Sequence, residues 1–323
     1  MRESVEEPAK RFPTDLQANL PTHPSGGSEQ VYCEPDHKAD QGHTRESPHT
    51  EERILPTRNE AWPNGTPCWV DLLVTDTGAA RQFYSGLFGW DIRDGPPEAG
   101  GYLMCMLNGH AVSAISPKAH DNPCLNVWST YLGSDDLDKA VAKAKAAGSQ
   151  FMTEPIDVMS TGRLAFAMDP SGARYGIWQA GDHMGAGVYN EPGALVWNEL
   201  MTRDYEGAKT FYRNVFGFTF AEIGEGFAYS TVKRASDGEV VAGLGELDAS
   251  GPAEVPRSWV VSFMAQDCDE SATKAVKLGA TIVRAPFDTR FGRMTSLTGT
   301  QGEAFCLIEA PKQDDSAGRS SQA

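Results

Sequence analysis

One stretch of this chain occurs twice. DTGAARQFYSGLFGW at residues 76–90 is matched by DYEGAKTFYRNVFGF at residues 204–218. Two further pairs follow in the same order: residues 136–155 match 267–286, and residues 162–180 match 292–310. A collinear repeat of this length indicates duplication of a whole module, and the turn-rich segment 181–193 is where the copies join. A chain of 323 residues is long enough for two such modules.

Each copy has the same order of predicted elements. An alternating strand, CWVDLLVTD or VWNELMTRD, ends at Asp76 or Asp204, and this side chain is placed to cap a short helix. Gly89 or Gly217 then ends the helix. Hairpin and strand signals follow, and a second strand leads into a second helix. Each module therefore reads as βαβββ followed by βαβββ, an α+β fold.

The composition of the chain limits the kinds of molecule that it can bind. The formal net charge is -16, so nucleic acid and an anionic membrane surface would both repel the chain. We expect a small-molecule ligand, no nucleic acid and no membrane. No secretory signal or membrane-spanning run is present, which favours a cytoplasmic protein, and the 6 cysteines form no CxxC pair. The oligomeric state stays open.

The ends of the chain differ from the modules. Residues 1–62 and 311–323 are polar and lack apolar periodicity, so we predict disordered tails there. We place the first module at 63–182 and the second at 193–310. Residues 1–62 also raise the question of whether the native start lies further downstream.

The ordered motifs carry a family resemblance. The helix with Phe83-Tyr84, the Leu-Phe-Gly-Trp that ends it and the later Asp-Pro-Ser-Gly at 169–172 resemble the vicinal oxygen chelate superfamily. This superfamily includes glyoxalase I, bleomycin-resistance proteins and extradiol dioxygenases. The chain is most similar to a two-module actinobacterial branch described as glyoxalase-like proteins or hydroxylases. The resemblance implies paired βαβββ units that form a curved sheet around a cavity.

The resemblance also implies positions for metal ligands. The first-strand histidine of metal-dependent relatives falls on Trp69 and Trp197, and the next ligand falls on Ser129 and Val260. The terminal glutamate falls on Gly176 and Cys306. The histidines left in the modules, His110, His120 and His183, occupy none of these positions. We therefore predict no metal and no cofactor, with a divalent metal at another ligand set as the alternative.

Strand alternation indicates what faces each cavity instead. Trp69 and Asp71 share one face of the first strand, as Trp197 and Glu199 do in the second module. Trp178 is placed to line the first cavity. We expect these five residues to bind substrate, with Asp71 and Glu199 as candidate general bases. The alternatives are a carboxylate bonded to a neighbouring side chain and indoles that only pack. Trp128 and Trp259 alternate away from the cavity and are expected to pack beneath a helix.

Three functions stay open. The first is a metal-free protein that binds a small, partly aromatic molecule, as sequestering resistance proteins or accessory proteins of secondary metabolism do. The second is an enzyme of the same superfamily, a lyase, hydroxylase or dioxygenase-like protein, that uses a carboxylate base or an unrecognised metal. The third is a structural or interaction protein. Whether the chain is an enzyme, and whether one or both cavities work, is left undecided.

Overall fold

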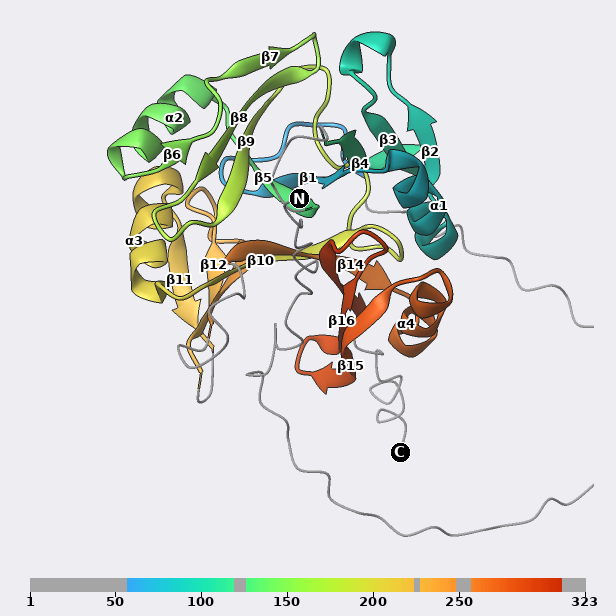
Figure 1. Cartoon of the computed structure of the whole chain (residues 1–323). Helices are drawn as coiled ribbons and strands as arrows, with labels where there is room; N and C mark the ends of the chain where they lie inside the picture. The colour runs from blue at the N-terminus through green and yellow to red at the C-terminus, as the bar shows by residue number, and fades with distance from the viewer. Residues whose placement is uncertain (1–56, 119–125, 224–226, 248–256, 310–323) are drawn as a thin grey trace, which may run out of the picture.

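Two similar modules make up the computed structural model, which describes residues 57–118, 126–223, 227–247 and 257–309 (Figure 1). The predicted tails therefore lie outside the described residues, except for residues 57–62. The first module contains β1 (Pro67–Val74), α1 (Thr77–Phe88), β2 (Asp91–Asp94), η1 (Pro97–Ala99), β3 (Leu103–Leu107), β4 (His110–Pro117), β5 (Val127–Gly133), α2 (Leu137–Ala146), β6 (Gln150–Phe151), β7 (Ile156–Val158), β8 (Gly162–Met168) and β9 (Arg174–Ala180). The second contains β10 (Leu195–Thr202), α3 (Tyr205–Phe216), β11 (Thr219–Glu222), β12 (Tyr229–Lys233), β13 (Val240–Glu246), β14 (Ser258–Ala265), α4 (Cys268–Lys277), β15 (Thr281–Thr289), β16 (Gly292–Thr298) and β17 (Ala304–Glu309).

Each module folds into one mixed sheet, which confirms the α+β prediction of two tandem modules. The strand order is β2-β3-β4-β1-β5-β9-β8-β6 in the first and β11-β12-β13-β10-β14-β17-β16-β15 in the second. In both sheets the first strand is parallel to the strand that ends its own unit and antiparallel to the first strand of the next unit. Two βαβββ units thus meet at the centre of each sheet.

One strand differs from the predicted order of elements. In the first module the strand after α2 is broken into β6 and β7, which both pair with β8. The second module keeps one strand there, β15, with register shifts on either side of Arg284. Pro155 and Pro286 occupy matching positions, and a proline removes one ladder hydrogen bond. A proline at the same position of the repeat therefore accompanies a broken strand in the first module and an irregular register in the second.

The repeated helix is built as its sequence predicts. The Asp76 carboxylate accepts a hydrogen bond from the Ala79 amide at 2.9 Å, and Gly89 ends α1 with a φ of 73°. Asp204 and Gly217 cap α3 in the same way. The buried residues of α1 share one face: Ala80, Phe83, Tyr84 and Leu87. A left-handed residue such as Gly89 costs little without a Cβ, so the chain can turn sharply into β2.

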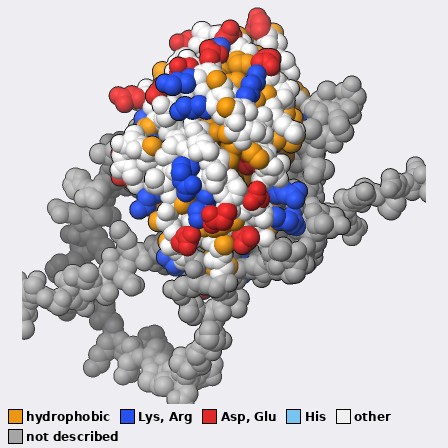
Figure 2. Space-filling model, turned by 90° about the vertical axis from the view of Figure 1, so that its left-hand side faces the viewer, with side chains coloured by type: hydrophobic (Ala, Val, Ile, Leu, Met, Phe, Trp, Pro, Cys, Tyr) orange, Lys and Arg blue, Asp and Glu red, His pale blue; other side chains and the backbone are white. Residues whose placement is uncertain are grey.

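The modules pack against each other across two shared cores. One core joins the first half of module one to the second half of module two, and the other joins the remaining halves. Helix α1 contacts α4, and α2 contacts α3, on opposite sides of the molecule in Figure 1. On the side where α2 and α3 lie, basic and acidic side chains are interspersed (Figure 2). Because each core takes residues from both copies, neither module buries its apolar faces alone.

The tyrosine of the repeated motif links the two modules. The Tyr84 hydroxyl donates to Glu303 of the second module at 2.9 Å and accepts from Trp128 Nε1 at 3.1 Å. Tyr212 likewise donates to Asp169 of the first module and accepts from Trp259. Trp128 and Trp259 are buried here, as expected from strand alternation. The repeated motif thus forms two related sets of hydrogen bonds at the module interface.

Residues 57–62 are folded, although we assigned them to the N-terminal tail. Thr57 forms a β-bridge with Val188, and the Trp62 indole donates to the Ala186 carbonyl at 3.2 Å. The Trp62 ring also packs edge-on against Tyr189, with centroids 5.0 Å apart. A single large aromatic side chain can hold a polar segment in place, and composition averaged over 62 residues does not reveal it.

Candidate ligand-binding site

The two faces of β1 have different surroundings. Val70, Leu72 and Val74 point into the shared core between the modules. Trp69 belongs to a separate cluster on the opposite face of the sheet. The alternation expected from the sequence therefore holds, and Asp71 lies on the Trp69 side because its position differs by two residues.

A tyrosine holds the first carboxylate. Asp71 is only 6 % exposed, and the Tyr131 hydroxyl donates to its Oδ2 at 2.6 Å. Burial raises the pKa of Asp71 to about 6 from the usual 3.8, although Tyr131, the Arg174 guanidinium and Ser129 oppose the shift. A carboxyl with this pKa exchanges its proton near neutral pH, which suits a general base or a switchable hydrogen-bond partner.

Two indoles and a histidine pack together on the same face of the sheet. Trp69 Nε1 donates to the Tyr102 hydroxyl at 3.2 Å. The Trp69 ring also meets the His183 imidazole edge-on, with centroids 4.4 Å apart. Trp178 donates from Nε1 to the His183 carbonyl at 3.0 Å. The structure thus brings Trp69, Asp71 and Trp178 to one face, as predicted, and adds His183 from the segment that joins the modules.

That joining segment reaches the site because Gly185 permits it. Its φ is 102°, and a Cβ there would lie 2.5 Å from the Cys68 carbonyl and 2.9 Å from the Trp62 ring. Only glycine fits such a position. Burial lowers the pKa of His183 to about 4, so its imidazole is neutral at pH 7.

Several polar atoms around this face have no partner. Five buried side-chain nitrogen or oxygen atoms of the described residues meet no partner at hydrogen-bond geometry, and Arg174 Nε and His183 Nε2 are two of them. Ser129 lies directly opposite Asp71 in the β1–β5 pair. A buried polar atom without a partner costs free energy, and such atoms at a cavity are expected where a ligand supplies the partner.

The second module has a closed network at the same place. Trp197 Nε1 donates to the Tyr229 hydroxyl at 3.3 Å, and that hydroxyl donates to Glu199 Oε2 at 2.8 Å. Burial raises the pKa of Glu199, which is 7 % exposed, and Tyr229 opposes the shift. Trp197 and Glu199 therefore meet as predicted, but their polar groups already have partners. Trp178 has Ile308 as its counterpart, so the two cavities differ.

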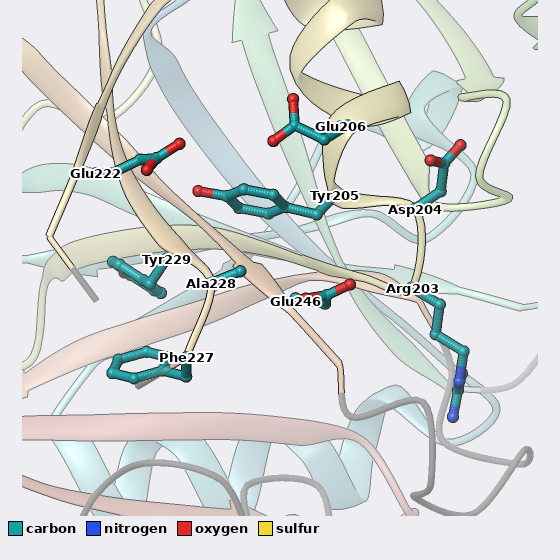
Figure 3. Close-up of a pocket in the computed structure, with 9 residues that line it drawn as sticks. All are labelled: Arg203, Asp204, Tyr205, Glu206, Glu222, Phe227, Ala228, Tyr229 and Glu246. Atoms are coloured by element: carbon teal, nitrogen blue, oxygen red, sulfur yellow. The ribbon is translucent and has the colours of Figure 1, made fainter. Parts of the chain in front are cut away.

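A hollow of about 460 Å³ lies beside this network, where Tyr229 contributes to the wall. Figure 3 shows carboxylates from Asp204, Glu206, Glu222 and Glu246 around it, together with Arg203. Lys209 bridges Glu206 and Glu222, each at 3.0 Å. This bridge compensates part of the negative charge, so the hollow is a polar surface depression next to α3.

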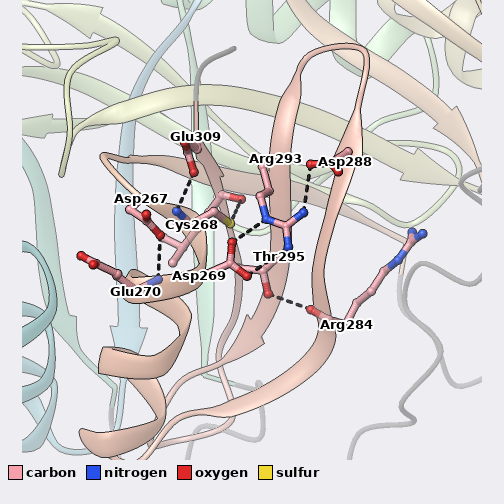
Figure 4. A network of polar contacts seen from close by, with 10 residues as sticks. Asp267, Cys268, Asp269, Glu270, Arg284, Asp288, Arg293, Thr295 and Glu309 are labelled. Atoms are coloured by element: carbon pink, nitrogen blue, oxygen red, sulfur yellow. Dashed lines mark hydrogen bonds and ion pairs between the residues drawn. The ribbon is translucent and has the colours of Figure 1, made fainter. Parts of the chain in front are cut away.

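A larger hollow, about 1030 Å³, lies between the end of α1, the residues that join the modules and α4. The α4 region is braced by Arg293, which binds Asp269 on α4 at 3.0 Å and Asp288 on β15 at 2.9 Å (Figure 4). Arg163 makes the equivalent contacts to Asp138 and Asp157 in the first module. This repeated clamp is architectural, and none of the unpaired buried atoms belongs to the residues that line this hollow.

The positions of the superfamily's metal ligands do not fit a metal in the first module. They are occupied by Trp69, Ser129 and Gly176, which offer no set of His or carboxylate donors. The Tyr131 ring fills the space above Gly176, because a Cβ on that glycine would lie 2.4 Å from the ring.

The second module gives the same result. Trp197, Val260 and Cys306 stand at its ligand positions, and Tyr229 covers Gly243. Across the part of the chain that the structure describes, no group of three or more His, Cys, Asp or Glu side chains could hold a metal ion. His110 begins β4 beside its hairpin, and His120 lies outside the described residues.

Fold and site together define a two-module protein of the vicinal oxygen chelate type, with Trp69 and Trp197 where the first metal ligand of each module would stand. Residues 68–177 and 194–307 each match the family model described as "Glyoxalase/Bleomycin resistance protein/Dioxygenase superfamily". The chain belongs to this superfamily. Among the described helices, none has the length and apolar character needed to cross a membrane.

Two relatives match along most of their length. "Putative glyoxylase CFP32" of Mycobacterium tuberculosis is 41% identical over 267 residues, which cover 80% of this chain and 100% of that protein. "Anthracycline biosynthesis protein DauV" of Streptomyces sp. (strain C5) is 34% identical over 261 residues, covering 76% of this chain and 93% of that protein. Both alignments span the two modules rather than one.

Solved structures share the fold at low identity. The Mn(II)-bound glyoxalase from Novosphingobium aromaticivorans superposes with a TM-score of 0.55 at 15% identity, covering 76% of this chain and 83% of that chain. Homoprotocatechuate 2,3-dioxygenase from Arthrobacter globiformis gives a TM-score of 0.54 at 15% identity, with coverages of 80% and 83%. These likenesses concern the fold alone.

Sequence reasoning missed four residues of the site: Tyr102, Tyr131, Arg174 and His183. Alternation could have found Tyr131, which lies two residues after Ser129 on one strand, and Arg174, which lies two residues before Gly176. Tyr102 precedes β3, and His183 lies in a turn-rich segment. No periodic pattern places a residue in either position.

Proposed function

We propose that the first module binds a small, flat, partly aromatic molecule without a metal ion, in a sequestering or accessory role. The observation that carries this proposal is the combination on one face of the sheet of two indoles, a buried carboxylate and polar atoms without partners. Indoles favour flat rings, and the unpaired atoms favour a ligand with polar groups at its edge.

The relatives support the same class of ligand. One carries the name of anthracycline biosynthesis, and anthracyclines contain flat, fused aromatic rings. The donor set at the inherited ligand positions supports binding without a metal, because Trp69, Ser129 and Gly176 cannot replace His and carboxylate ligands.

A second candidate is an enzyme that uses Asp71 as a general base. The pKa of about 6 favours it, since a base whose pKa lies near the working pH can both accept and release a proton. Tyr131 would hold the carboxylate in place through its hydrogen bond. Glu199 has a weaker case, because its partner Tyr229 is itself held by Trp197.

The test is a fluorescence titration of the full chain, treated with chelator, against a panel of fused-ring aromatic compounds. We expect quenching that Trp69→Phe removes and that the matched variant Trp197→Phe leaves intact. Mass analysis of the same mixtures separates the candidates, since a changed compound identifies an enzyme. Binding that requires an added divalent metal, or no binding by any fused-ring compound, would refute the proposal.

A further inference from the structure

Asp71, Ser129 and Arg174 lie in a row across one face of the first sheet. Asp71 on β1 pairs directly with Ser129 on β5. Strand β5 pairs in parallel with β9, with Tyr131 beside Gly176. The same register, continued by two residues, places Arg174 beside Ser129. Neighbouring strands lie about 4.8 Å apart, so the three side chains follow one another across the sheet.

The ends of this row have opposite hydrogen-bonding capacity. The Asp71 carboxylate accepts hydrogen bonds, and the Tyr131 hydroxyl occupies one of its acceptor sites. Arg174 can only donate, and its buried Nε has no acceptor. The Arg174 guanidinium is fixed over the Phe166 ring, 4.5 Å from the ring centroid. Arg174 lies two residues before Gly176, and the Tyr131 ring fills the space above that glycine, so Arg174 shares the face of β9 on which Tyr131 contacts Asp71.

The second module lacks this row. Val260 stands at the place of Ser129, and Ala304 at the place of Arg174. Its acid, Glu199, accepts from Tyr229, which in turn accepts from Trp197. Because both modules share one fold, the fold does not require a serine or an arginine at these positions. Ser129 and Arg174 are therefore features of the first module alone.

We infer that Arg174 and Asp71 select a flat ring system that carries a carbonyl and a hydroxyl on the same edge. The Arg174 Nε–H donates to the ligand carbonyl, and the ligand hydroxyl donates to the Asp71 carboxylate. Ser129 lies between Asp71 and Arg174, and its hydroxyl can form a hydrogen bond with either the carbonyl or the hydroxyl of the ligand. This inference rests on the proposed function and adds the chemical class of the ligand and the module that binds it.

The experiment compares three probes that share one ring system: an acetonaphthone whose hydroxyl stands meta to the acetyl group and cannot bond to it internally, an acetonaphthone without the hydroxyl, and a naphthol. Their affinities for the full chain are measured by tryptophan fluorescence. We expect the hydroxy ketone to bind about tenfold to a hundredfold more tightly than either single-group probe, the range expected for hydrogen bonds to charged groups.

The variants test whether Arg174 causes that preference. Arg174→Met and Arg174→Lys should both abolish it, because lysine keeps the charge but lacks the Nε–H. Arg284→Met is the matched control, since Arg284 lies over the Phe287 ring in the second module. It should leave the preference unchanged. Urea unfolding of each variant checks that it is folded.

The outcomes distinguish this inference from the proposed function. If no probe binds, the proposed function fails and the inference fails with it. If probes bind in a Trp69-dependent manner but without preference, only the inference is overturned. A preference that survives in both folded Arg174 variants overturns it as well. A preference lost in both Arg174 variants and kept in Arg284→Met supports it.

Discussion

Replacing Asp71 with asparagine should stabilise the protein while weakening ligand binding. The carboxyl is buried, and its pKa rises from 3.8 to about 6 on folding. Folding therefore favours the protonated form, and the stability tied to that proton is present below the unfolded pKa. It is lost as the pH rises through the folded pKa. Ionised Asp71 should cost about 3 kcal/mol at pH 8, from roughly two pKa units at about 1.4 kcal/mol each.

Asparagine removes this pH dependence because it has a similar shape and no charge. Its carbonyl oxygen can still accept from the Tyr131 hydroxyl. At pH 4.5 the wild-type protein already carries about 1 kcal/mol of the cost, because some protons have left the unfolded chain. The stability difference between Asp71→Asn and wild type should therefore increase by about 2 kcal/mol in favour of the variant between pH 4.5 and pH 8.

Urea unfolding at these two pH values measures the difference. Asp182→Asn removes an exposed carboxylate near the same site and should show little change between the two pH values. Binding of the aromatic probes, followed by tryptophan fluorescence, should weaken in Asp71→Asn. A stability difference that does not change with pH would refute the argument that Asp71 is a desolvated acid. Stabilisation without loss of binding would leave Asp71 as a packing residue only.

Two further predictions concern the module interface. Tyr84→Phe and Tyr212→Phe should each destabilise the fold by about 2 kcal/mol in urea unfolding, because each leaves a buried carboxylate and an indole N–H without their shared partner. As the control, Tyr189→Phe at a half-buried site should change little, and equal small effects in all three would refute the role of the interface hydroxyls. Separate expression of residues 57–182 and 183–309 should give chains with poor near-ultraviolet circular dichroism that gain it on mixing, since each core is shared by both modules; a well-folded single module would contradict this.

The fold could be predicted from the sequence because the same local signals occur in both copies of the repeat. The Asp cap, the apolar face at Ala80, Phe83, Tyr84 and Leu87, and the terminal glycine are local signals, and they recur in order. The position of Trp69 and Asp71 on one face followed from alternation along a single strand. These inferences need no knowledge of distant contacts.

The remainder of the site depends on contacts between distant segments. Tyr131 reaches Asp71 because β1 and β5 pair antiparallel in one register, and a shift by one residue would turn it to the other face. His183 reaches Trp69 only because Gly185 adopts a backbone conformation that brings the joining segment close. The periodicity of the sequence predicts neither of these two contacts.

The duplication also explains why the two cavities can differ without loss of the fold. The residues that bond the modules together, Tyr84 with Glu303 and Tyr212 with Asp169, lie on α1 and α3 and in the turns next to β17 and β8. The residues that differ, such as Arg174 and its counterpart Ala304, lie on cavity-facing positions in our inference. Along β1, Val70 and Leu72 face the shared core while Trp69 faces the opposite side, so a change on one face leaves the other face packed. In the second module Glu199 is thus bonded to Tyr229, whereas in the first module Arg174 Nε and His183 Nε2 are left without a partner in the structure.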